Sequence, residues 1–189
     1  NRLSQRRIEV TVPTRRRERT KALIIQPNVL MPEVNINAEG ALESLLQGQD
    51  AVINLVGILH SRDVALPYSK DFAEAHVELP KKIIAACRKA GVRRLVHMSA
   101  LGANPKGPSE YLCSKGDGEA IVMAAQGDLE VTVFRPSVIF GLGDSFLNTF
   151  ADVLRKLPGD LAIGHNRYST AGSSRIANAQ PIHSIISPR

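Results

Sequence analysis

Strand-like apolar runs alternate with helical patterns along this chain, and that alternation is the strongest constraint on its fold. Residues 51–56 read Ala-Val-Ile-Asn-Leu-Val, a nearly continuous apolar run typical of a strand buried on both faces of a parallel sheet. A helical stripe of apolar residues follows over residues 72–90, and a second strand pattern covers 94–98. Strands that alternate with helices predict an α/β fold with a doubly wound parallel sheet.

The same periodicities predict further elements on both sides of this central part. Additional strands are predicted over residues 7–12, 29–36 and 130–134, and additional helices over 38–46, 109–126 and 145–157. Pro80 lacks a backbone N–H, so it is expected to kink the helix at 72–90 or to mark a late start. Ser109 is a candidate N-cap for the helix that follows it.

The charge distribution argues against a nucleic-acid-binding surface. The net charge is +6, and residues 1–21 alone carry eight basic and two acidic side chains, which accounts for the whole excess. The rest of the chain is balanced. Two interpretations of the basic segment stay open, a local anion site near 15–19 and a solvated helix start.

Membrane and metal sites are not expected either. No run approaches the roughly 20 apolar residues of a membrane span. Cys87 and Cys113 form no CxxC pair and no cluster with histidines, so neither a zinc site nor a disulfide framework is expected. These features favour a reducing, cytoplasmic location.

Three polar residues suggest proton-transfer chemistry. Ser99 ends the apolar run at 95–98, and Tyr111 and Lys115 open the helical pattern at 109–126. Residues four apart share one helix face, so Tyr111 and Lys115 can point into one site. A neighbouring ammonium lowers the pKa of a phenol, which prepares the tyrosine for acid–base work, and a serine hydroxyl can hold a substrate carbonyl.

This arrangement resembles the short-chain dehydrogenase/reductase superfamily, in its atypical, extended form. The resemblance implies a Rossmann-like sheet, a nicotinamide cofactor, and catalytic roles for Ser99, Tyr111 and Lys115. It also implies that Lys115 holds the nicotinamide ribose, and that four further segments line the cofactor. The implied cofactor-binding residues are Thr14, Arg15, Arg16, Asn54, Val56, Gly57, Lys115, Arg135, Pro136 and Val138, the last three within the Arg-Pro-Ser-Val-Ile-Phe-Gly segment at 135–141. Arginines after the second strand suit a 2′-phosphate, so NADP is favoured over NAD.

Within that superfamily, residues 54–150 resemble the branch of the NAD(P)-binding accessory subunit of respiratory complex I and its bacterial homologues. The segments that carry this resemblance are 76–80 (His-Val-Glu-Leu-Pro), 97–102 (His-Met-Ser-Ala-Leu-Gly) and 109–119. Complex I, or another protein complex, is therefore an implied partner. A place at the periphery of the inner membrane is the alternative location that this resemblance leaves open.

One part of the expected fold has no counterpart in the sequence. Such folds begin with a strand and a Gly-rich turn whose backbone N–H groups hold the pyrophosphate, and no GxxGxxG occurs in the chain. Because the first strand is central in these sheets, its absence predicts an unpaired seam. We therefore expect residues 1–156 to form a truncated NAD(P)-binding domain in which cofactor binding is impaired.

Residues 157–189 differ in kind from the rest. The segment 159–182 resembles part of the glutaminase half of glutamine amidophosphoribosyltransferase, notably in Gly-His-Asn-Arg-Tyr-Ser-Thr at 164–170 and Asn-Ala-Gln-Pro at 178–181. By that resemblance Arg167 would bind the glutamine carboxylate. The activity uses an N-terminal cysteine, and the chain has none, so no glutamine hydrolysis is expected.

Three functions remain open from sequence alone. The first is an NAD(P)-dependent oxidoreductase or an epimerase-like enzyme of the short-chain dehydrogenase class. The second is a non-catalytic accessory or assembly subunit of the complex I type that binds nucleotide for stability. The third is an inactive truncated or chimeric fragment.

Overall fold

The computed structural model describes residues 2–139, and the predicted helix at 145–157, the end of the 135–141 motif and the whole segment 157–189 lie outside them. In chain order its elements are α1 (Arg2–Gln5), β1 (Val10–Thr11), a 3-10 turn (Arg17–Thr20), α2 (Lys21–Ile24), β2 (Val29–Leu30), α3 (Ala41–Leu46), β3 (Ala51–Asn54), α4 (Lys70–Ala73), a π-helical segment (Glu74–Glu78), α5 (Leu79–Ala90), β4 (Arg94–Met98), α6 (Glu110–Ala124) and β5 (Glu130–Phe134).

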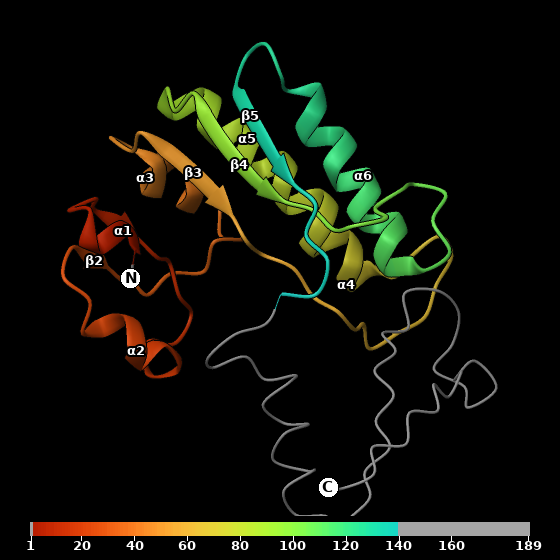
Figure 1. Cartoon of the computed structure of the whole chain (residues 1–189), viewed down its shortest axis with the longest axis horizontal. Coiled ribbons are helices and arrows are strands. Elements are labelled where there is room, and N and C mark those ends of the chain that lie inside the picture. Colours follow the sequence, from red (N-terminus) through yellow and green to blue (C-terminus); the bar gives the residue numbers. More distant parts are fainter. Residues whose placement is uncertain (1, 140–189) are drawn as a thin grey trace, which may run out of the picture.

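The strands β3, β4 and β5 form a parallel three-stranded sheet in that order, so the predicted α/β architecture is confirmed. Helices α5 and α6 pack together against this sheet (Figure 1). The core between them is apolar and includes Ile83, Cys87, Leu95, Val122 and Leu129. Apolar burial of this kind, at roughly 25 cal/mol per Å², is the main term that holds such layers together.

The seam predicted from the sequence is present. Strand β1 pairs in parallel with β2 alone, and among residues 2–139 no strand lies between β1 and β3. Thr11 and Pro13 face the segment 51–56 across an apolar groove of about 150 Å³. Figure 1 shows the β1–β2 unit set apart from the three-stranded sheet.

The predicted helix at 72–90 is interrupted, and Pro80 explains where. Helix α4 starts two residues earlier than predicted, at Lys70, and gives way to the π-helical segment before α5. Pro80 has no N–H to offer the carbonyl of His76, four residues before it. The widened turn Glu74–Glu78 absorbs this loss, and the N–H of Leu79 bonds to the carbonyl of Glu74.

Other boundaries differ in smaller ways. The strands predicted over 7–12 and 29–36 shorten to β1 and β2, although backbone bonds such as Val34 N–H to Thr14 O (2.8 Å) continue the pairing past Pro32. The strand predicted over 51–56 ends at Asn54, because the Asn54 side chain accepts the N–H of Val56 (3.1 Å) and turns the chain. Helix α3 begins at Ala41 rather than 38.

Four predictions near the site are confirmed. Strand β4 has the predicted bounds, and so does β5. Helix α6 lies within the predicted range 109–126, and the Ser109 hydroxyl caps it by accepting the N–H of Leu112 (3.3 Å).

Candidate functional site

The candidate residues gather at the carboxyl ends of β3, β4 and β5. Asn54 ends β3 beside His97 of β4, and Ser99 follows β4 with its N–H bonded to Phe134 O of β5 (2.8 Å). In open α/β sheets, ligands bind outside the carboxyl ends of the strands. The topology therefore brings together side chains that are up to 80 residues apart in sequence.

Lys115 is the buried cation of this site. Its side chain is 4% exposed, and its Nζ donates a hydrogen bond to Met98 O (2.6 Å) at the end of β4. Burial lowers the pKa of Lys115 to about 8, and the negative charge of Glu119 opposes that change. A Cβ placed on Gly57 would lie 3.4 Å from His76 Nε2 and 3.9 Å from Lys115 Nζ, so the turn after β3 runs directly past the ammonium.

Tyr111 lies one helical turn before Lys115. Its ring meets the His76 ring edge-on, with centroids 5.6 Å apart, and the Phe72 ring at 6.4 Å. Helix α6 and the segment from α4 to α5 thus enclose the tyrosine from two sides. The predicted effect of Lys115 on the Tyr111 pKa stays a prediction.

The Ser99 hydroxyl is engaged inside the protein. Ser99 is 3% exposed, and its Oγ donates to Glu119 Oε2 at 2.6 Å. The same carboxylate accepts the Nε of Arg135 at 2.9 Å and pairs with its terminal nitrogen. Glu119 was not predicted from the sequence as a site residue. Its signal was the i, i+4 spacing from Lys115, which puts a carboxylate on the Tyr111–Lys115 face.

Two buried histidines complete the surroundings of Lys115. His76 Nε2 accepts the N–H of Ile58 (3.1 Å), and its Nδ1 lies 2.9 Å from Ser114 Oγ. His97 Nδ1 accepts from the amide of Asn54 (3.1 Å), since that nitrogen can only donate. Burial first, and then the Lys115 charge, lower the pKa of His76 to about 3 and that of His97 to about 4. Both rings are therefore neutral near pH 7.

Comparison with known proteins decides the family. Residues 1–141 match the family described as NAD(P)H-binding. This chain belongs to the NAD(P)H-binding family. A parallel sheet is the architecture that Rossmann-like nucleotide-binding domains have.

Similar proteins are found both by sequence and by structure. One is the mouse mitochondrial NADH dehydrogenase [ubiquinone] 1 alpha subcomplex subunit 9, 37% identical over 113 residues, which are 59% of this chain and 28% of the relative. Among solved structures, a dTDP-glucose 4,6-dehydratase from Streptomyces venezuelae with bound NAD superposes with a TM-score of 0.65 at 20% identity, over 78% of this chain and 53% of that one. The chain thus spans less than a third of its mouse relative and about half of the dehydratase.

A separate short segment matches a different protein. The amidophosphoribosyltransferase of Synechococcus elongatus is 70% identical over 30 residues, which are 16% of this chain and 6% of that relative. The predicted resemblance of the tail is confirmed as a sequence match. Its domain boundary at 157 and its lack of activity stay predictions.

The residues expected to line an NAD(P)H molecule lie in two places, at the sheet ends and across the seam, and the turn that would hold its pyrophosphate is missing from the sequence. Near the sheet ends, Gly57 has no Cβ, so its backbone passes close to the buried ammonium of Lys115. Across the seam, Thr14 shapes a turn in which its Oγ1 accepts the N–H of Arg16 (3.2 Å) and donates to its carbonyl (3.1 Å). Arg15 and Arg16 are exposed there, free to meet an anion. The Gly-rich turn for the pyrophosphate is absent from the sequence.

The remaining implied residues flank the same edge. Pro136 continues the chain past β5, where its carbonyl accepts the N–H of Leu101 (2.8 Å). Val138 is 45% exposed and Val56 is 42% exposed, so both present apolar surface at this end of the molecule.

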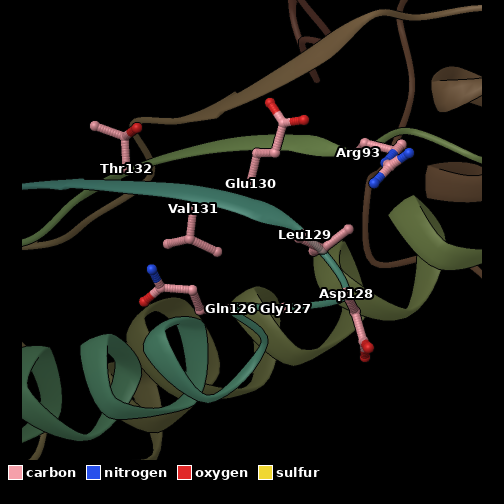
Figure 2. Close-up of a pocket in the computed structure, with 8 residues that line it drawn as sticks. All are labelled: Arg93, Gln126, Gly127, Asp128, Leu129, Glu130, Val131 and Thr132. Carbon is pink, nitrogen blue, oxygen red and sulfur yellow. The ribbon is translucent and has the colours of Figure 1, made fainter.

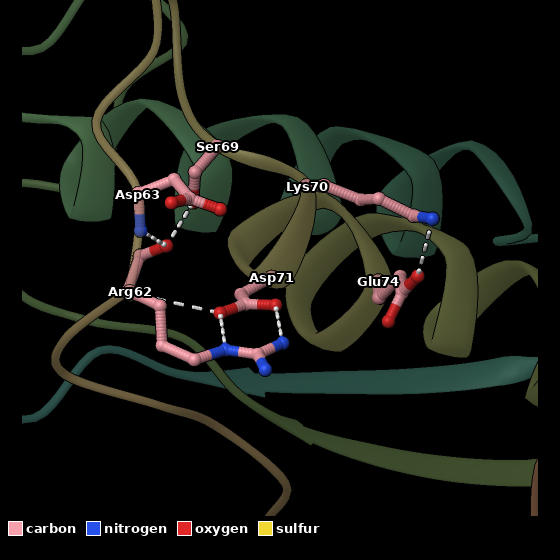
Figure 3. A network of polar contacts seen from close by, with 7 residues as sticks. Arg62, Asp63, Ser69, Lys70, Asp71 and Glu74 are labelled. Atoms are coloured by element: carbon pink, nitrogen blue, oxygen red, sulfur yellow. Dashed lines mark hydrogen bonds and ion pairs between the residues drawn. The ribbon is translucent and has the colours of Figure 1, made fainter.

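The loop after Gly57 is tied to the start of α4 (Figure 3). The Arg62 side chain donates two hydrogen bonds to the Asp71 carboxylate, of 2.9 and 3.1 Å, and the Arg62 backbone N–H donates a third of 3.3 Å. These hydrogen bonds hold the pKa of Asp71 at about 2. The Ser69 hydroxyl also bonds Ser61 (2.5 Å), so the loop that borders the site is anchored at several points.

A larger hollow lies at the opposite end of the sheet (Figure 2). It measures about 420 Å³ and is lined by Arg93 and residues 126–132, around the amino ends of β4 and β5. None of the candidate site residues contributes to it. This hollow is a competing location for a ligand.

No helix in the part of the chain that the structure describes is long and apolar enough to cross a membrane.

The neutral histidines predict acid sensitivity. A histidine with a lowered folded-state pKa binds its proton more readily when unfolded, so stability falls as the pH drops below about 6.5 and stops falling near the folded pKa values. With His76 and His97 together, we expect a loss of about 3 kcal/mol between pH 7 and pH 5. Urea denaturation at these two pH values measures it, and the variant His97→Gln should lose roughly half as much. A flat profile would contradict the buried, neutral assignment.

Proposed function

We propose that this domain binds a nicotinamide dinucleotide as part of an accessory subunit of the complex I type, and that it does not turn the cofactor over. One observation carries the proposal: the single proton of the Ser99 hydroxyl is donated to Glu119. A hydroxyl has one donor, so Ser99 has none left for a substrate carbonyl. The similarity to the mouse mitochondrial subunit supports this assignment.

The site residues keep the roles that nucleotide binding needs. Lys115 supplies a positive charge beside the Gly57 turn, and Asn54 and Val56 shape that turn. Arg15 and Arg16 supply charge at the adenosine end. The partner is a respiratory assembly, and the domain lies on the cytoplasmic side at the periphery of the inner membrane.

Binding and turnover can be tested on the same protein. We expect a fluorescence titration to give NADPH binding weaker than micromolar, because no Gly-rich turn holds the pyrophosphate. Sub-micromolar binding would show that this turn is dispensable. We also expect no steady oxidation of NADPH by carbonyl acceptors.

A second candidate function, an oxidoreductase or epimerase-like enzyme, is favoured by one observation. Tyr111 and Lys115 lie one turn apart on α6, and Lys115 lies close to the Gly57 turn. In that case Tyr111 is the acid–base group and Lys115 keeps it acidic. Hydride transfer that disappears in Tyr111→Phe would establish this function in place of the first.

The arginines predict a cofactor preference. Replacing Arg15 and Arg16 together by glutamate should weaken NADPH binding about tenfold, because a charge-assisted contact to the 2′-phosphate is lost. NADH affinity should change much less, since NADH lacks that phosphate. Parallel titrations with both nucleotides measure the ratio, and Arg93→Glu at the far end of the sheet serves as the charge control. An equal loss for both nucleotides would remove the argument for NADP.

A further inference from the structure

We propose that Glu119 is the positioning residue of the nucleotide site, a buried carboxylate that fixes Ser99 and Arg135 and lies one helical turn from Lys115. This inference rests on the proposed function, because it assumes that the nucleotide binds at the carboxyl ends of the strands. It assigns Ser99 to the support of the site rather than to the substrate.

Glu119 connects helix α6 to the carboxyl ends of two strands. It projects from α6, is 7% exposed, and accepts bonds from Ser99 Oγ at the end of β4 and from the guanidinium of Arg135 just after β5. These hydrogen bonds lower the pKa of Glu119, with that from Arg135 the largest cause, so the carboxylate is ionised. A buried charge is tolerated only when it is paired and hydrogen-bonded, and here both conditions are met.

The pairing leaves Arg135 only partly enclosed. Its side chain is 56% exposed although Glu119 holds it on one side. The carboxylate therefore fixes the direction of the guanidinium at the carboxyl edge of the sheet. Arg135 is also one of the residues implied to line the cofactor, so its orientation matters for binding.

The charge of Glu119 also acts on Lys115, one helical turn away. The titratable groups that act on this ammonium are His76 from the π-helical segment, His97 from β4 and Glu119 from α6 itself. Tyr111 precedes Lys115 by one turn of α6, and its ring meets that of His76. The two histidines are neutral at pH 7 and carry no compensating negative charge. Glu119 raises the pKa of Lys115 against the effect of burial.

Charge and hydrogen bonding can be separated with two variants. Glu119→Gln removes the charge and keeps a side chain of similar size, whereas Ser99→Ala removes one hydrogen bond and leaves the charge. Glu130→Gln is the matched control, because it removes the same charge from an exposed residue at the amino end of β5. Each variant is compared with the unmodified chain between pH 6 and pH 9.

Two readouts are measured on each protein. The first is the pKa of Lys115, from an NMR titration of its side chain without nucleotide. The second is the NADPH dissociation constant as a function of pH. We expect Glu119→Gln to lower the Lys115 pKa below about 8 and to weaken NADPH binding about threefold or more at pH 7.5, with a smaller loss of affinity at pH 6. Ser99→Ala and Glu130→Gln should leave the Lys115 pKa unchanged.

The outcomes distinguish the two claims. If the unmodified chain binds no NADPH, the proposed function fails, and the NMR titration still tests whether Glu119 controls Lys115. If NADPH binds but Glu119→Gln leaves both the Lys115 pKa and the pH profile unchanged, the positioning role is overturned. A loss of affinity equal at all pH values, and matched by Ser99→Ala, would overturn the charge argument as well. Should Glu119→Gln fail to fold, Arg135→Gln, which leaves the Glu119 charge in place, must preserve the Lys115 pKa, and a fall there would contradict the account.

Discussion

Gly118→Ala is expected to destabilise this protein by about 3 kcal/mol or more, although alanine is the better helix former. Gly118 lies in the middle of α6, and a Cβ there would collide with the backbone carbonyl of His76. That carbonyl belongs to the turn where Pro80 offers no N–H, so α6 approaches the π-helical segment closely at this point. Backbone atoms cannot move aside as a flexible side chain can, so the two helices must separate.

The sign of the effect makes this a strict test. Helix propensity alone predicts that Gly118→Ala stabilises the chain by about 1 kcal/mol. Ala120→Gly, on the exposed side of the same helix, measures the propensity difference in this context. Urea denaturation followed by circular dichroism gives both values. A stabilised Gly118→Ala variant would mean that α6 and the π-helical segment are not in backbone contact.

Lys115→Met should abolish most NADPH binding and at the same time stabilise the fold. The ammonium is the only buried lysine among the described residues, and a pKa lowered to about 8 means that burying its charge costs about 3 kcal/mol. Methionine keeps the length of the side chain and removes that cost, so we expect a gain of about 1 to 3 kcal/mol in the free energy of unfolding. NADPH affinity should fall at least about tenfold, since a charge beside the Gly57 turn is lost.

The opposite signs of these two effects identify a functional residue. A side chain retained for stability would lose both binding and stability when it is replaced. Lys81→Met on the exposed face of α5 is the control, and it should leave both quantities within experimental error of the unmodified chain. Lys115→Met with full NADPH affinity would exclude Lys115 from the site.

The sequence predicted the architecture because the central elements carry clear periodicity. Strand β4 has a clear apolar run, α5 has a clear apolar stripe, and α6 has a strong N-cap in Ser109. The positions of β4 and α6 were confirmed. For the helix at 72–90, the sequence predicted only that Pro80 would kink it or mark a late start. Its form depends on the close approach of Gly118 to His76, a tertiary contact that no local pattern contains. The shortening of β3 depends likewise on a side-chain bond from Asn54.

The candidate site was predicted only in part for a similar reason. Tyr111 and Lys115 could be placed together from helical spacing, and Ser99 from its position after a strand. The partner of the Ser99 hydroxyl could not be predicted, because Glu119 reaches it only once α6 packs beside β4. That contact changes the interpretation of Ser99 from a substrate-orienting group to part of a buried polar network.

The central claim is that the nucleotide binds at the carboxyl ends of the strands, beside Gly57 and Lys115. The most direct test is a map of backbone NMR shifts on addition of NADPH. We predict that the largest changes fall in residues 54–58 and 111–115. Changes confined to Arg93 and residues 126–132, around the hollow at the opposite end of the sheet, would contradict the account, as would a spectrum that NADPH leaves unchanged.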